Sequence, residues 1–263
     1  MGQSSEAIFA GMYIHPMKTP DYQPRYYRDW SKDRDLVSFN VVVKETDLYI
    51  RARRHLKNKA LEIVQRQRSL LENYISRHPG FLTALEPFPL GDDAPAIARA
   101  MEEAGEKVKV GPMAAVAGAF AEFVGRDLLK FSAEVIVENG GDIFLKSTKT
   151  RLVGVYAGEN SPLTGKIALK IEPADTPLGI CTSSGTVGHS LSFGKSDAVI
   201  VLSPSTALAD AAATAIGNIV KGETDLQKAL DYARGVTGLV GVAVIINDKM
   251  GVWGKINLIR RDQ

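Results

Sequence analysis

The sequence predicts an α+β protein in which antiparallel sheets carry helices packed on one side. Two segments of the chain repeat one order, a helix rich in small residues followed by two short strands that a tight turn joins. Strands joined by tight turns pair antiparallel, and helices outside the strand pairs pack together on one face. Apolar residues make up 45% of the 263 residues, which is typical of a globular protein with a core.

The bulk composition argues against several functional classes. The formal net charge is only +2, which gives the whole chain no bias toward nucleic acid or an anionic membrane. No apolar run reaches bilayer length, and the first ten residues lack the features of a secretory signal. Cys181 is the only cysteine, which excludes an internal disulfide and a Cys-based zinc site. We therefore expect a cytoplasmic protein with no nucleic-acid or membrane partner.

The first third of the chain predicts strands and then one long helix. Short runs of β-branched and aromatic residues indicate strands at 8–17 and 36–43, and the aromatic residues between them fit an edge hairpin. Apolar residues recur at helical spacing over 53–77. Arginines and lysines from Arg51 to Arg68 are assigned to this helix, where they are typical of a solvated face.

A loop rich in proline follows at 80–95 and precedes a short helix at about 94–104. We expect one domain over 1–263, with this loop as its internal boundary.

The second half carries the repeated order. The first unit has a helix at 112–125 and strands at 134–138 and 143–147. The second unit has helices at 205–220 and about 224–234, then strands at 241–246 and 250–254. Low identity between the two units leaves an internal duplication of a helix-hairpin unit as a hypothesis.

Further strands are predicted at 152–157, 166–171, 178–182 and 197–202. Residues 198–202 are apolar throughout, which predicts a central, buried strand. Small side chains in the helices would let them approach such strands closely.

Three segments are candidates for chemistry. The first is the turn Asn139-Gly140-Gly141-Asp142 between two apolar strands. Its glycines leave the backbone bare, but Asn-Gly is also the strongest local signal for a plain hairpin turn.

The second segment, 181–190, contains five hydroxyl side chains, two glycines and His189 directly after a strand. Hydroxyls and free backbone N–H groups are what phosphate oxygens need. The composition also fits a polar surface loop, yet its position favours a ligand loop. A Walker A motif is rejected, because the glycine spacing is wrong and a strand follows.

The third segment is the helix that begins near Ser205. Asp210, Thr214 and Asn218 are four residues apart, so they share one face of a helix that is otherwise apolar. Carboxylate and hydroxyl oxygens suit Mg²⁺, which commonly bridges protein and phosphate. A stripe that faces solvent explains the pattern equally well.

At these three segments the chain resembles the ApbE-like superfamily; ApbE itself is an FAD:protein FMN transferase that uses Mg²⁺. The turn at 139–143 resembles the family's Gly-Gly-Asp segment, and residues 182–185 resemble its Thr-Ser-Gly loop. Residues 205–214 resemble its late Ala-Asp-Ala…Thr helix. The order agrees from about residue 111 onward. ApbE enzymes carry His-x-Ile-Asp-Pro where this chain reads Gly188-His189-Ser190-Leu191-Ser192, so it resembles a shorter branch.

The resemblance implies an ApbE-like or tunnelling-fold-like architecture and a site for FAD or FMN. In that family the Asp and Thr of the late helix help to hold the metal, which implies Mg²⁺ at Asp210 and Thr214. His189 is a candidate for acid–base work. The residues expected at the flavin nucleotide are Asn139, Gly140, Gly141, Asp142, Thr182, Ser183, Ser184, Gly185 and Thr186.

Two functions remain open at this point. One is a flavin-nucleotide binding protein related to Mg²⁺-dependent FMN transferases, with an acceptor protein as partner. The other is a non-catalytic ligand-binding or assembly protein on the same fold. Sheet edges in such folds often pair between subunits, so a homodimer fits either hypothesis.

Overall fold

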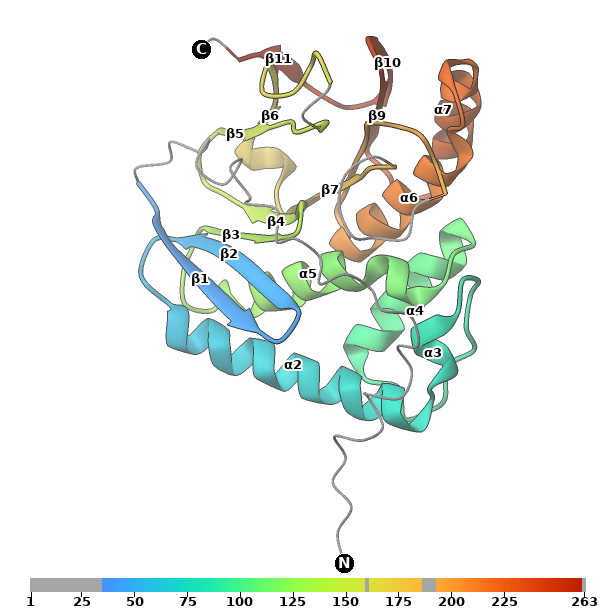
Figure 1. The fold of residues 1–263 in the computed structure, drawn as a ribbon. Coiled ribbons are helices and arrows are strands. Elements are labelled where there is room, and N and C mark those ends of the chain that lie inside the picture. Colours follow the sequence, from blue (N-terminus) through green and yellow to red (C-terminus); the bar gives the residue numbers. More distant parts are fainter. Residues whose placement is uncertain (1–34, 159–160, 186–192, 262–263) are drawn as a thin grey trace, which may run out of the picture.

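The computed structural model describes residues 35–158, 161–185 and 193–261. Its centre is one eight-stranded sheet in the order β1-β2-β3-β4-β7-β8-β9-β10, in which each strand pairs antiparallel with its neighbours. Helices cover one face of this sheet, and a three-stranded sheet lies against the other (Figure 1). The predicted α+β class, with helices on one side of an antiparallel sheet, is confirmed.

The large sheet consists of two halves with the same chain order. Each half is a hairpin, then helices that cross the sheet face, then a second hairpin. The strands of the first half are β1 (Val37–Val43), β2 (Thr46–Ala52), β3 (Val135–Asn139) and β4 (Asp142–Lys146). Those of the second are β7 (Leu178–Ser183), β8 (Ala198–Ser203), β9 (Gly241–Ile246) and β10 (Lys249–Gly254). The repeated unit is therefore longer than the helix-hairpin unit that the sequence shows.

Two sets of helices connect the hairpins. Between β2 and β3 lie α2 (Lys57–Arg77), α3 (Gly80–Thr83), α4 (Ala96–Val108), the 3-10 turn Pro112–Ala115 and α5 (Val116–Leu128). Between β8 and β9 lie α6 (Thr206–Ile219), the 3-10 turn Glu223–Asp225 and α7 (Leu226–Arg234). The loop at 84–95 joins α3 to α4, and Phe81, Ala94 and Ile97 pack in one hydrophobic cluster.

The small sheet has the order β11-β6-β5 and buries the second face of the large one. Its strands are β5 (Arg151–Gly154), β6 (Ile167–Ile171) and β11 (Leu258–Arg260), and the 3-10 turn Pro173–Asp175 follows β6. Because both faces of the central strands are covered, β8 is buried at every position, as its apolar sequence predicts.

Several local predictions need correction. The long helix begins at Lys57, not at residue 53, and Arg51 belongs to β2, which the sequence did not indicate. The strand predicted at 36–43 pairs with β2. The strand predicted at 8–17 lies outside the described residues.

Close helix–sheet packing follows from small residues, as expected. A Cβ placed on Gly125 of α5 would lie only 2.1 Å from Cδ1 of Phe144 on β4. Glycine therefore lets the α5 backbone rest directly on the aromatic ring. This contact sets the height of α5 above the sheet and so helps to position the start of the same helix.

A buried ion cluster joins the two sheets. The Glu134 carboxylate is 0% exposed and accepts hydrogen bonds from Arg151 (2.7 Å), Ser147 (2.6 Å) and Thr148 (2.6 Å). Arg151, at the start of β5, also pairs with Asp35 at 2.8 Å. Because every oxygen of the Glu134 carboxylate is bonded, the charge is tolerated inside the protein.

Within the described ranges, no single helix is both long and apolar enough to span a membrane; only the pair Ala96–Val108 and Pro112–Leu128, bent by 106°, meets that test of length and composition together.

Candidate functional site

The Gly-Gly segment forms the tight turn between β3 and β4. Asn139 pairs with Asp142 across it, and Gly140 and Gly141 both have positive φ angles of 68° and 109°. The plain hairpin turn is therefore present. The Asn139 side chain donates to the backbone oxygen of Ala117 at 3.1 Å, which fastens the turn to the first turn of α5.

Asp142 lies at the start of β4 and reaches the end of β7. Its Oδ1 accepts a hydrogen bond from the Thr182 backbone N–H at 3.3 Å. The neighbouring Cys181 thiol lies on the helix side of β7 and donates to the Thr206 carbonyl at 3.4 Å. The turn and the hydroxyl-rich segment thus meet at the Asp142 carboxylate.

Asp210 of α6 faces the start of α5. Its Oδ2 accepts a hydrogen bond from the Gly118 N–H at 2.8 Å. The two helices are very close here, because a Cβ on Gly118 would lie 2.4 Å from the Thr206 carbonyl oxygen. Ala115, which precedes α5, has no side chain that can cap the helix, so Asp210 performs that task from another helix.

A second carboxylate makes the arrangement reciprocal. Glu122 Oε2 on α5 accepts hydrogen bonds from the N–H groups of Thr206 (2.7 Å) and Ala207 (3.4 Å), the first two residues of α6. Each helix therefore places a carboxylate at the N-terminus of the other. Both carboxylates gain from the partial positive charge at those ends.

The electrostatics of Asp142 and Asp210 are linked. Burial raises the pKa of Asp142 to about 7, against hydrogen bonds from Cys181 and Thr182. Burial and the Asp142 carboxylate together raise the pKa of Asp210 well above its usual range, against the hydrogen bond from Gly118. Burial and Asp142 also raise the pKa of the Cys181 thiol. Near neutral pH, two ionised carboxylates here are unfavourable unless a proton or a cation lies with them.

The polar stripe of α6 is its accessible face. Asp210, Thr214 and Asn218 are partly exposed, whereas ten other residues of this helix are buried. The stripe runs from Asp210 toward the C-terminal end of the helix. Thr214, one turn beyond Asp210, adds a hydroxyl oxygen to the same face.

The hydroxyl-rich segment begins against this stripe. A Cβ on Gly217 of α6 would lie 3.6 Å from Ser183 Oγ, so Ser183 is beside the last turns of the helix. The Gly185 N–H donates to the Ser196 carbonyl at 2.9 Å, and Asn218 Oδ1 accepts from the Phe193 N–H at 2.9 Å. Ser183 and Phe193 are therefore both next to α6.

The structure brings together most of the residues predicted for the site. Thr182 and Asp142 are in contact, Asp210 interacts with Asp142, and Ser183 lies along the helix that carries Thr214. Ser184 and Gly185 follow on the same segment. Thr186 and His189 lie outside the described residues.

Sequence reasoning missed Glu122, because a carboxylate in an amphipathic helix gives no local sign that it caps a distant one. Among the described residues there is no cluster of three or more His, Cys, Asp or Glu side chains suited to hold a metal. The donors available to a cation at Asp142 and Asp210 are thus carboxylate, hydroxyl and backbone oxygens, the set that Mg²⁺ prefers.

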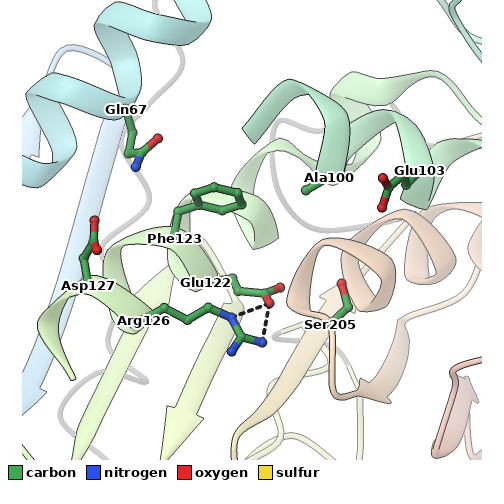
Figure 2. Close-up of a pocket in the computed structure, with 8 residues that line it drawn as sticks. All are labelled: Gln67, Ala100, Glu103, Glu122, Phe123, Arg126, Asp127 and Ser205. Atoms are coloured by element: carbon green, nitrogen blue, oxygen red, sulfur yellow. Dashed lines mark hydrogen bonds and ion pairs between the residues drawn. The ribbon is translucent and has the colours of Figure 1, made fainter. Parts of the chain in front are cut away.

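Two cavities lie elsewhere. One of about 510 Å³ is bordered by α2, α4, α5 and Ser205 (Figure 2). The other, of about 160 Å³, lies between α2 and α5. Gln67 of α2 contributes to the first and is a polar residue within an apolar helical stripe, which is a signal that the sequence does contain.

Comparisons with known proteins place the chain in a family. The "UPF0280 protein" of Methanocaldococcus jannaschii is 43% identical over 242 residues, which cover 89% of this chain and 95% of the relative. That of Methanococcus aeolicus is 43% identical over 212 residues, covering 78% and 85%. The fold matches a solved variant of the flavin transferase ApbE from Vibrio cholerae with a TM-score of 0.54 and 14% identity, over 83% of this chain and 96% of that one.

The family model described as AbpE bacteria matches residues 28–251, which is most of the chain. On this match, together with relatives of more than 40% identity along most of their length, the chain belongs to the AbpE bacteria family.

Proposed function

We propose that this protein binds a flavin nucleotide, FAD or FMN, together with Mg²⁺, at the junction of the β3–β4 turn, the end of β7 and α6. The observation that carries the proposal is the hydrogen bond from the Thr182 N–H to the Asp142 carboxylate, which joins the β3–β4 turn to the hydroxyl-rich segment within reach of the charge of Asp210. The fold that the chain shares with a flavin transferase supports it.

The residues at this junction fit a divalent cation. Burial raises the pKa of Asp142, and burial together with the Asp142 carboxylate raises the pKa of Asp210; a nearby cation would relieve both, and Mg²⁺ commonly takes one or two carboxylates and substrate phosphates. Asp210 Oδ2 accepts a hydrogen bond from the Gly118 N–H, so a metal at this carboxylate would share it with the α5 backbone. Thr214 would supply a hydroxyl oxygen from the next turn of α6.

The segment from Thr182 to Thr186 would hold the phosphate oxygens through its hydroxyls and N–H groups. The bare backbone of Gly140 and Gly141 permits a nucleotide to approach the turn closely. When bound, Mg²⁺ would offset negative charge on the pyrophosphate. If the protein transfers FMN, its partner is an acceptor protein with a Ser or Thr hydroxyl, and His189 would move the proton.

Isothermal titration with FAD, with and without Mg²⁺, tests the proposal. We expect saturable binding of FAD that requires Mg²⁺ and weakens at least tenfold in Asp142→Asn and Thr214→Val. Asp231→Asn, a change on the exposed face of α7, serves as the control and should bind as the unmodified protein does. FAD binding that ignores Mg²⁺ and both substitutions would remove the proposed site.

The second candidate is a non-catalytic ligand-binding or assembly protein on this fold. The hydrogen bond from Gly118 to Asp210 favours it, because that carboxylate then has a structural task that needs no metal. Incubation with FAD, Mg²⁺ and a candidate acceptor protein separates the two: covalent FMN on the acceptor supports transfer, and binding without transfer supports the second candidate.

A further inference from the structure

The cavity of about 510 Å³ is separate from the proposed flavin site. It opens between α2, α4, α5 and the start of α6 (Figure 2). Ser205, which lines it, precedes α6, whereas Asn218, which accepts a hydrogen bond from the Phe193 N–H, is in the last turn of that helix. The volume lies within the range of pockets that hold small organic ligands.

Gln67 supplies a polar group to this cavity from within the apolar face of α2. It belongs to the buried stripe that includes Val64 and Leu71, and it is only 8% exposed. Its side-chain amide has no hydrogen-bond partner in the part of the chain that the structure describes, so it can bond a ligand. The amide is directed toward Phe123 and the cavity (Figure 2), where a ligand can satisfy it.

The charges around the cavity leave one carboxylate unmatched. Arg126 is paired with Glu122 at 2.7 Å. Asp127 is paired with Lys130 at 2.6 Å and with Arg66. Glu103, at the rim, forms neither an ion pair nor a hydrogen bond within the described ranges. A ligand that enters the cavity therefore meets the unpaired negative charge of Glu103.

The remaining surface of the cavity is apolar. Phe123 of α5 and Ala100 of α4 lie between Gln67 and Glu103 (Figure 2). A ligand that reaches both polar groups must therefore cover apolar surface in between, and an aromatic face also attracts a cation.

We propose that this cavity binds a small organic cation, an amine or guanidinium compound with an apolar body. Glu103 pairs with the positive group, the Gln67 carbonyl accepts one of its N–H donors, and Phe123 and Ala100 contact the apolar body. An anion is disfavoured, because it would meet the Glu103 carboxylate while Arg126 is already paired.

Titration calorimetry with agmatine, in the absence of FAD and Mg²⁺, tests this inference, with succinate as the anionic counterpart. We expect one agmatine per chain, no binding of succinate, and weaker binding at higher salt. Glu103→Gln and Gln67→Leu should each weaken agmatine binding at least tenfold. Glu106→Gln, one turn along α4 and paired with Lys109 away from the cavity, is the matched control and should not change it.

Three results would overturn the inference. The first is no agmatine binding up to millimolar concentration. The second is agmatine binding by Glu103→Gln and Gln67→Leu that is as tight as by the unmodified protein, and the third is a tenfold loss of affinity in the control Glu106→Gln as well. Thermal unfolding of each variant identifies any that fail to fold. No flavin is present in this titration, so a negative result would not affect the proposed flavin site. In the same way, a negative result in the flavin experiments would not affect the proposed cation site.

Discussion

Asp210 has an unusual set of neighbours for a residue on the accessible face of a helix. It bonds the Gly118 N–H at the start of α5 and lies near the Asp142 carboxylate. The close approach of α5 and α6 that permits this contact depends on Gly118, which has no room for a side chain. The position of the carboxylate is therefore decided by a glycine on the other helix.

We expect Gly118→Ala to destabilise the protein by about 1–3 kcal/mol, because the added Cβ would lie 2.4 Å from the Thr206 carbonyl and force the helices apart. Urea unfolding measures the effect. Gly222→Ala is the control, since nothing lies within 4 Å of a Cβ there. Equal stability of the two variants would show that α5 and α6 do not need this contact.

The buried Glu134 carboxylate predicts how the stability of the protein changes in acid. Burial alone would raise its pKa, but hydrogen bonds from Ser147, Thr148, Arg151 and Arg53 outweigh it and lower the pKa to about 2 from an unperturbed 4.5. Because the folded state holds the proton more weakly than the unfolded chain, this stabilisation is complete above pH 4.5 and is lost as the pH falls toward 2. The shift corresponds to a contribution on the order of 3 kcal/mol.

Urea unfolding between pH 2 and 7 tests this expectation. Glu134→Gln should be less stable than the unmodified protein at pH 7. Below pH 4.5 its free energy of unfolding should decrease much less than that of the unmodified protein. Glu62→Gln, an exposed change on α2, should keep the full fall. An unaltered acid profile in Glu134→Gln would contradict the assignment.

At the scale of elements, the paired capping of α5 and α6 is the contact that holds the candidate site together. Glu122 caps α6 and Asp210 caps α5, so loss of one carboxylate leaves unbonded N–H groups in a buried helix end. Ser205 adds a side-chain cap to α6 by accepting from the Leu208 N–H at 3.3 Å. None of these three capping interactions requires a ligand.

We expect Glu122→Ala to lower the free energy of unfolding by about 1–3 kcal/mol, because Thr206 and Ala207 lose their acceptor. Hydrogen exchange should accelerate selectively at the first turn of α6. Glu223→Ala, which changes the turn after α6, is the control and should leave that first turn protected. Unchanged exchange at Thr206 in Glu122→Ala would refute the capping role.

At the scale of the whole molecule, the two halves share one sheet and one set of helices. β4 pairs with β7 at the middle of the sheet, and α5 and α6 cap each other above that junction. The small sheet then covers strands of both halves from the other side. Neither half can lose its structure without exposing apolar surface of the other.

We therefore expect the protein to unfold in one cooperative step. Far-UV circular dichroism and fluorescence should give the same midpoint in urea, since Trp253 on β10 is packed against the helices of the second half. Two separated transitions would show that the halves are independent units, with a boundary at or near the β4–β7 junction rather than at 80–95.

Much of the fold follows from local sequence. Small-residue helices, the Asn-Gly turn and the apolar run at 198–202 each specify their own element, because spacing and turn chemistry act within a few residues. The sequence did not reveal β2 (Thr46–Ala52), because the charged residues at its end fit the helix that begins soon after it, at Lys57. It also missed β11, which is only three residues long.

The sequence by itself determined which segments carry polar chemistry: the turn at Asn139, the segment after Cys181 and the stripe on α6. Only the tertiary structure decided that Asp142 and Asp210 share one environment, that Glu122 and Asp210 cap opposite helices, and that Gln67 faces a cavity. The physical reason is range: propensity and periodicity act between neighbours along the chain, whereas desolvation and charge coupling depend on groups that only folding brings together.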